Sequence, residues 1–129
     1  MDNQFGFDDD PHNPPTSILF GPDFLSSKLY HLSPPEDLTL AKMLVRPERL
    51  YGAEVAEEMA LTEEKYGSVR RVFVVCEEDK VLKEDFQRWM IQKNPPEEVE
   101  DISGSDHMVM LSNPAHLCSS LLGIAERFY

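Results

Sequence analysis

Val72-Phe73-Val74-Val75-Cys76 is a continuous run of β-branched and aromatic residues in a chain of 129 residues. A run of this kind, without alternating polar positions, predicts a strand that is buried on both faces of a parallel sheet. The polar residues that follow, from Glu77 to Lys80, predict a loop at the carboxyl end of that strand. The run therefore favours an α/β fold.

The residues after this loop continue the same pattern. Helical spacing over residues 83–92 predicts a helix, a more polar segment over residues 98–102 predicts a strand at a sheet edge, and Asn113-Pro114 begins a last helix. The first helix is expected to bury Phe86, Trp89 and Met90. The apolar stripe of the last helix consists of Leu117, Cys118, Leu121, Leu122, Ala125 and Phe128. This order of elements predicts a right-handed parallel β-α-β unit with a closing helix.

The N-terminal part of the chain has a different character. Residues 1–22 are rich in proline and show little periodicity, which predicts loop or disorder with one short strand over residues 17–20. A short helix is expected over residues 23–29. Ser33 is placed as the N-cap of a longer helix that Arg46-Pro47 ends.

The composition limits the classes of function. The chain is 41% hydrophobic and 28% charged, as in a soluble domain, but it has only about half the length of α/β enzymes with a full sheet. Its net charge of −12 argues against binding to nucleic acid or to an anionic membrane. No apolar run is long enough to span a bilayer, and no histidine spacing predicts a zinc site, so we expect neither metal nor cofactor. Cys76 and Cys118 lie in apolar surroundings, which predicts buried thiols and a reducing, cytoplasmic compartment.

Asp79 and His107 each follow a predicted strand, at the carboxyl edge where functional groups of parallel sheets gather. Neighbouring strands lie about 4.8 Å apart, so the two loops can bring these side chains into contact. An acid followed by a histidine is the end of the order used by α/β-hydrolases, in which the carboxylate orients the imidazole base. Glu77, Glu78 and Asp106 are alternative acids, and Asp106 ranks lower because adjacent loop side chains generally point apart. The other alternative is that Asp79 and His107 only cap the helices that follow.

No nucleophile motif precedes this pair. Ser68 and Ser105 each follow a glycine, but neither lies in the G-x-S-x-G pattern of a nucleophile elbow. Met108 and Met110 are candidates for lining an apolar substrate pocket, with plain core packing as the alternative. Trp89 is more consistent with core packing than with a ligand contact.

Ordered motifs along the chain resemble the plant methylesterases. In the C-terminal half they are Tyr66-Gly67-Ser68-Val69-Arg70-Arg71-Val72, Glu78-Asp79-Lys80, Phe86-Gln87-Arg88-Trp89, Asp106-His107-Met108-Val109-Met110-Leu111 and Leu121-Leu122-Gly123-Ile124-Ala125. In the N-terminal half they are Phe20-Gly21-Pro22, Lys28-Leu29-Tyr30, Glu36-Asp37-Leu38 and Leu44-Val45-Arg46-Pro47. This family has the α/β-hydrolase fold. It includes methyl salicylate, methyl jasmonate and methyl indole-acetate esterases, polyneuridine aldehyde esterase and the related hydroxynitrile lyases.

The resemblance implies roles for segments and for single residues. Residues 1–65 would be part of the helical cap with an irregular N-terminal segment, and residues 66–129 the last β-α-β-α unit of the hydrolase core. Asp79 matches the triad acid and His107 the triad base. Met108 stands where hydroxynitrile lyases carry a lysine, which favours ester hydrolysis over cyanohydrin cleavage.

The function that the resemblance implies is hydrolysis of small carboxylic methyl esters through an acyl-serine intermediate. Family members carry the nucleophile elbow and most of the sheet upstream of the cap, so we expect a truncated chain that is inactive, or nearly so, alone. The alternative is a non-catalytic protein that binds a small aromatic or lipid-derived acid, or that associates with itself or with a full-length relative. A hydroxynitrile lyase activity ranks third. An unpaired sheet edge also predicts instability or association.

Overall fold

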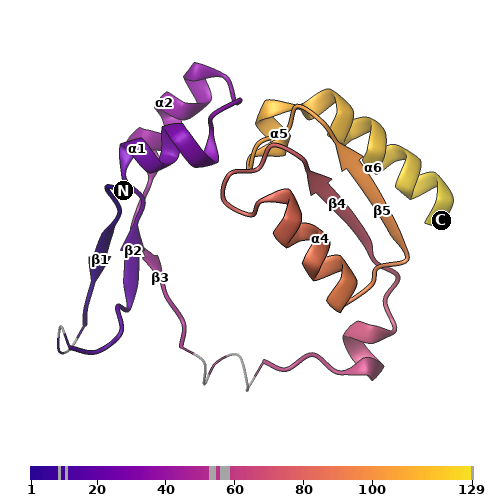
Figure 1. Ribbon diagram of the computed structural model, residues 1–129, viewed down its shortest axis with the longest axis horizontal. Helices are drawn as coiled ribbons and strands as arrows, with labels where there is room; N and C mark the ends of the chain where they lie inside the picture. The colour runs from indigo at the N-terminus through magenta and orange to yellow at the C-terminus, as the bar shows by residue number, and fades with distance from the viewer. Residues whose placement is uncertain (9, 11, 53–54, 56–58, 129) are drawn as a thin grey trace.

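The computed structural model describes residues 1–129 apart from residues 9, 11, 53–54, 56–58 and 129. The described residues form two groups of elements, one within residues 1–49 and one from residue 63 onward (Figure 1). The second group contains the predicted parallel unit, and the first group lies against one end of it.

The C-terminal group is built on two parallel strands. Strand β4 (Val72–Cys76) pairs with β5 (Glu98–Ile102), and helix α4 (Glu84–Lys93) connects them. The short helix α5 (Val109–Ser112) and the long helix α6 (Pro114–Phe128) follow. The strands, their parallel pairing and the two long helices confirm the predicted order of elements.

Helices α4 and α6 cover opposite faces of this small sheet (Figure 1). Phe73 of β4 lies beside Met90 of α4 in one surface cavity, whereas Val74 lies beside Ile124 of α6 in another. Successive side chains of a strand point to opposite faces, so adjacent positions of β4 meet different helices.

Strand β4 and helix α4 are less buried than the sequence predicted. Helices cover both faces of β4, but only Val75 is buried and the other residues of the strand are half-buried, so the predicted full burial was wrong. In α4, Phe86 and Trp89 expose 45% and 49% of their surfaces and stack on one another, and the buried side chain is Gln87 instead. The predicted burial of Phe86 and Trp89 was wrong because a two-stranded sheet covers only one side of the helix.

Helix α6 shows the same pattern. Ile124 and Phe128 are half-buried, whereas Cys118, Leu121 and Leu122 of the predicted apolar stripe are exposed. The prediction of a buried thiol was therefore wrong for Cys118. Burial by other residues raises the pKa of the half-buried Cys76 thiol, and both cysteines are free.

The N-terminal group contains a small antiparallel sheet of β1 (Gln4–Gly6), β2 (Ser17–Leu19) and β3 (Glu48–Arg49). Strand β2 confirms the short strand predicted there, but the irregular character predicted for the rest of residues 1–22 was wrong at β1. Its three residues, of which Phe5 alone is apolar, carry too little periodicity to be recognised as a strand before their partner is known.

The helical part of this group follows β2. Helix α1 (Pro22–Phe24) runs into the π-helix η1 (Leu25–Leu29), and helix α2 (Pro35–Leu44) comes after a short turn. Leu25 and Leu29 of η1 are buried. A further π-helix, η2 (Glu63–Gly67), precedes β4.

The predicted N-cap role of Ser33 was wrong. Pro34 is the N-cap residue of α2 and makes no side-chain capping hydrogen bond. The Ser33 hydroxyl instead donates to the Asp106 carboxylate, 73 residues away in the chain. No helix among the described residues is long and apolar enough to cross a membrane.

Candidate active site

The loop after β4 holds the Asp79 side chain in a fixed orientation. Oδ1 of Asp79 accepts hydrogen bonds from the backbone N–H groups of Val81 (2.7 Å) and Leu82 (3.0 Å). The Asp79 N–H in turn donates to the carbonyl of Cys76, the last residue of the strand. Asp79 exposes only 7% of its surface. One carboxylate oxygen is thus used to orient the group, and Oδ2 remains for another partner.

The loop after β5 brings the histidine to the same edge. Gly104 has a φ of +67°, a left-handed conformation that glycine adopts without strain, and it turns the chain back toward β4. The two loops are then bonded to each other. The Glu78 N–H donates to the Ser105 carbonyl (3.1 Å), and the Ser105 N–H donates to the Glu78 carboxylate (3.0 Å).

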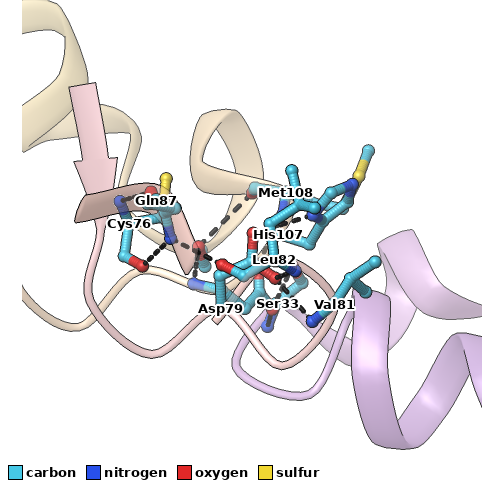
Figure 2. A network of polar contacts seen from close by, with 10 residues as sticks. Ser33, Cys76, Asp79, Val81, Leu82, Gln87, His107 and Met108 are labelled. Carbon is cyan, nitrogen blue, oxygen red and sulfur yellow. Dashed lines mark hydrogen bonds and ion pairs between the residues drawn. The ribbon is translucent and has the colours of Figure 1, made fainter. Parts of the chain in front are cut away.

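Asp79 and His107 lie in direct contact at this edge. Nδ1 of His107 is 2.8 Å from Oδ2 of Asp79 (Figure 2). An ionised carboxylate only accepts hydrogen bonds, so Nδ1 is the donor and Nε2 is the nitrogen able to accept a proton. The geometry is that of a base oriented by a carboxylate.

Two of the alternative acids, Glu78 and Asp106, have other partners. The Glu78 carboxylate binds the Ser105 N–H, and the Asp106 carboxylate binds the segment before α2. Among the described residues, Asp79 is the acid in contact with the His107 imidazole.

Asp106 joins the two groups of elements. Its carboxylate is fully buried and accepts hydrogen bonds from the N–H groups of Leu32, Ser33 and Met108, each at 2.9 Å. Burial raises the pKa of Asp106, but the hydrogen bonds from Leu32, Met108, Ser33 and Ser112 outweigh it and hold the pKa below its ordinary value. Asp106 therefore remains ionised and ties the residues before α2 to the backbone on both sides of His107.

An apolar cavity of about 550 Å³ opens beside His107. The N-terminal group supplies most of its wall, and Met108 and Leu111 flank the histidine. The apolar side chains that this group contributes include Phe20, Leu25, Leu29, Leu40, Leu44 and Val45. Of the two methionines predicted to bind substrate, Met108 lines this cavity, whereas Met110 exposes about half of its surface and is not among the lining residues.

Tyr30 adds a polar group to the cavity wall. Burial and the negative charges of Asp106 and Asp37 raise the pKa of its phenol. The hydroxyl therefore stays protonated at neutral pH and is able to donate a hydrogen bond. No group of three or more metal-ligating side chains gathers within the part of the chain that the structure describes.

Sequence reasoning missed the roles of three polar residues around the pair: Gln87, which binds the Asp79 loop, and Ser33 and Asp106, which bind each other. Gln87 shares a helical face with Met90 and Ile91, so a polar residue on the inward face was a usable signal. The contacts of Ser33 and Asp106 span 73 residues and leave no local pattern.

Comparison with known proteins identifies relatives of this chain in both sequence and structure. The chain is 56% identical over 128 residues to methyl jasmonate esterase 1 of Vitis vinifera and 48% identical over 128 residues to salicylic acid-binding protein 2 of Nicotiana tabacum. It superposes on the crystal structure of tomato methylketone synthase I complexed with 2-tridecanone with a TM-score of 0.93 at 49% identity. These alignments cover 98–100% of this chain.

The chain belongs to the plant methylesterase family of α/β-hydrolases. Polyneuridine aldehyde esterase is a further structural relative, with a TM-score of 0.88 at 39% identity. No protein-family model matches the chain. The chain spans about half the length of the curated relatives it matches, 49% for both methyl jasmonate esterase 1 and salicylic acid-binding protein 2.

Proposed function

We propose that this methylesterase-family chain supplies the acid, the base and the cap wall of the acyl pocket for hydrolysis of small carboxylic methyl esters. The 2.8 Å contact between Asp79 and His107 at the rim of an apolar cavity carries this proposal. Membership of the methylesterase family supports it. The nucleophile would come from a polypeptide segment outside the 129 residues, because the sequence has no G-x-S-x-G motif.

In the proposed reaction, Nε2 of His107 removes the proton of a serine hydroxyl while that oxygen attacks the ester carbonyl. Asp79 stabilises the imidazolium through Nδ1. His107 then gives the proton to the leaving methoxide, so methanol departs and an acyl-serine remains. Water repeats the sequence with His107 as base, which releases the carboxylic acid and restores the serine.

The cavity supports an apolar acyl group. Its wall is mostly aliphatic and aromatic, and Tyr30, Asp37 and His107 are the lining residues with polar groups. Methyl jasmonate esterase 1 is named for an ester of a lipid-derived acid, and the tomato methylketone synthase structures hold 2-tridecanone and β-ketoheptanoate. We propose methyl esters of comparable apolar acids, and the free cysteines support a reducing compartment such as the cytoplasm.

The exposed apolar side chains support association with another polypeptide. Trp89 on α4 and Leu121 and Leu122 on α6 are exposed, and among the described residues β4 pairs only with β5. An unpaired strand edge flanked by apolar side chains favours pairing with a further strand. The proposed partner is the upstream half of a full-length methylesterase, or a second copy of this chain.

Complementation tests the catalytic proposal. This chain is co-expressed with the upstream half of methyl jasmonate esterase 1, and hydrolysis of methyl jasmonate is followed by release of methanol. We expect hydrolysis by the complex and none by the upstream half alone. Two matched controls are His107→Ala in this chain and His116→Ala on the exposed start of α6. The first should abolish hydrolysis, and the second should leave it unchanged.

A stable complex that does not hydrolyse the ester would contradict the proposal. Equal hydrolysis by the wild-type chain and by His107→Ala would contradict it as well, because His107 would then not be the base.

Binding of a small acid without catalysis is a second candidate function. One observation favours it: the cavity wall beside His107 comes from residues of this chain. Salicylic acid-binding protein 2, a relative, is named for such a ligand. Isothermal titration of the 129-residue chain with salicylate and with jasmonate tests it. Saturable binding that Leu40→Glu in the cavity wall removes would support this function, and absence of heat with both acids would exclude it for these ligands.

A further inference from the structure

Gln87 is the buried polar side chain of α4, and all of its hydrogen-bonding groups are used at the acid loop. It exposes 4% of its surface. Its amide nitrogen donates to the carbonyls of Cys76 (2.8 Å) and Leu82 (2.7 Å), and its amide oxygen accepts from the Cys76 N–H (3.0 Å). One side chain thus binds three backbone groups, of which the Cys76 carbonyl also accepts from the Asp79 N–H.

The two residues that Gln87 binds are the two ends of the loop that carries Asp79. Cys76 is the last residue of β4, and Leu82 lies just before α4. Figure 2 shows Gln87 beside this loop, with Asp79 between the ends and His107 beyond it.

Cys76 and Leu82, the two residues that anchor this loop to Gln87, also bind Asp79 directly. The Cys76 carbonyl accepts from the Asp79 N–H, and the Leu82 N–H donates to Oδ1 of Asp79. Gln87 and Asp79 are therefore linked through two shared backbone segments. A shift of either anchor would change the direction of the Asp79 carboxylate, whose Oδ2 lies against Nδ1 of His107.

We propose that Gln87 is a positioning residue that holds the Asp79 loop closed and so keeps the Asp79 carboxylate aligned with His107. Its catalytic consequence depends on the function proposed above, whereas the alignment itself is a property of this chain. A purely structural role, joining α4 to β4, would affect stability without changing the contact between Asp79 and His107. The two roles therefore predict different results at the imidazole.

The alignment is measured as the low-field proton resonance of the His107 Nδ1–H group in the NMR spectrum of the 129-residue chain. The variants are Gln87→Met, which keeps the approximate volume and removes all three hydrogen bonds, and Gln87→Glu, which keeps the acceptor for Cys76 and loses both donors. The matched control is Gln92→Met on the exposed side of the same helix. His107→Ala assigns the resonance.

We expect both Gln87 variants, if folded by circular dichroism, to lose the resonance or to exchange it at least tenfold faster with water, and Gln92→Met to keep it. A folded Gln87→Met variant with an unchanged resonance and exchange rate would overturn the proposal. Where the resonance is not observed, hydrogen exchange of the Val81 and Leu82 amides decides, measured in whichever Gln87 variant folds and in Gln92→Met. Faster exchange in the Gln87 variant than in Gln92→Met would support the proposal, and equal exchange in the two would overturn it.

Turnover by the complemented enzyme gives an independent readout. Misplacement of a catalytic group by about 1 Å can cost on the order of 10²-fold in rate. We expect Gln87→Met to lower kcat by about that factor with KM little changed. If the wild-type complex does not hydrolyse esters, the function proposed above fails, while the resonance and exchange data still decide the role of Gln87.

Discussion

The carboxyl edge of the small sheet and the outer faces of its helices are organised in opposite ways. At the edge, polar side chains are buried and satisfied: Asp79, Gln87, Ser105 and Asp106. On the outer faces, large apolar side chains such as Trp89 and Leu122 are exposed. The geometry of the candidate site is therefore set by hydrogen bonds within the chain, whereas the apolar faces lack cover among the described residues. The contact between Asp79 and His107 thus forms without a complete hydrophobic core.

The largest expected effect comes from the acid at the polar edge. In the complemented enzyme, Asp79→Asn should lower kcat about 10⁴-fold, because an amide can present its NH₂ group to Nδ1 and stabilise the wrong tautomer of the imidazole. Initial rates with methyl jasmonate measure this. Asp85→Asn, on the exposed start of α4, is the control. A loss of less than tenfold would show that the contact between Asp79 and His107 is not used in turnover.

The next largest effect concerns the contact between Asp106 and the residues before α2. Asp106→Ala leaves the N–H groups of Leu32, Ser33 and Met108 without their acceptor, so the free energy of unfolding should fall by about 2–4 kcal/mol. Urea denaturation measures the loss, and hydrogen exchange should show the Leu32 and Ser33 amides opening first. Asp106→Asn keeps one acceptor oxygen and should lose less. Unchanged protection of both amides would mean that other contacts hold the residues before α2 in place.

Acidification should weaken the same attachment. The pKa of Asp106 is lower in the folded chain than its ordinary value of about 3.9, so its stabilising contribution is complete above that value and is lost as pH falls through the folded pKa. The stability gap between the wild type and Asp106→Asn should therefore narrow below about pH 4. The neighbouring phenol of Tyr30 does not titrate in this range, because the ordinary pKa of tyrosine is about 10 and burial raises that of Tyr30 further. Denaturation curves measured from pH 7 to pH 3 test this, and a constant gap would contradict it.

The same contrast explains what the sequence predicted. The run at Val72 and the helical spacings are local patterns, so the β-α-β-α order was recognised before any contact was known. Asp79 and His107 were found because parallel strands bring their carboxyl ends to one edge. The role of Asp106 depends on a turn 73 residues away, and Gln87 on the path of a loop. Neither contact produces a periodic pattern of residues that could be recognised in the sequence. The exposure of Trp89 was missed because a pattern shows which side chains share a face but not what covers that face.

The exposed apolar face of α6 can be tested in the same way as the polar edge of the sheet. The double variant Leu121→Gln with Leu122→Gln removes two exposed apolar side chains, so self-association of the chain should decrease several-fold. Sedimentation velocity at several protein concentrations measures it. Ser119→Gln, exposed on the same helix, is the control. Concentration dependence equal to that of the wild type would show that the α6 face takes no part in association.

The smallest expected effect comes from the exposed carboxylate of Glu97, whose hydrogen bonds are as short as those of Asp106. Glu97 accepts two hydrogen bonds from the Arg70 guanidinium, at 2.7 and 2.8 Å, and Arg70 lies 4.0 Å from the centre of the Phe128 ring. The pairing lowers the pKa of Glu97 and raises that of Arg70. Both side chains are exposed, so solvent and salt screen the interaction. Glu97→Gln should barely shift the thermal midpoint, and the difference should disappear in 1 M NaCl, a salt concentration at which the screening length is about 3 Å.

Glu97 and Asp106 thus make hydrogen bonds of similar length, but Glu97 is exposed and Asp106 is buried. Comparing their variants separates the effect of hydrogen-bond geometry on stability from the effect of burial. If Glu97→Gln destabilises the chain as much as Asp106→Asn, hydrogen-bond geometry alone sets the strength of these contacts. If only Asp106→Asn is costly, burial is the cause, because a buried N–H group that loses its acceptor has no water to replace it. The second result is expected, and it would place the stability of the polar edge in the same few residues that orient Asp79 and His107.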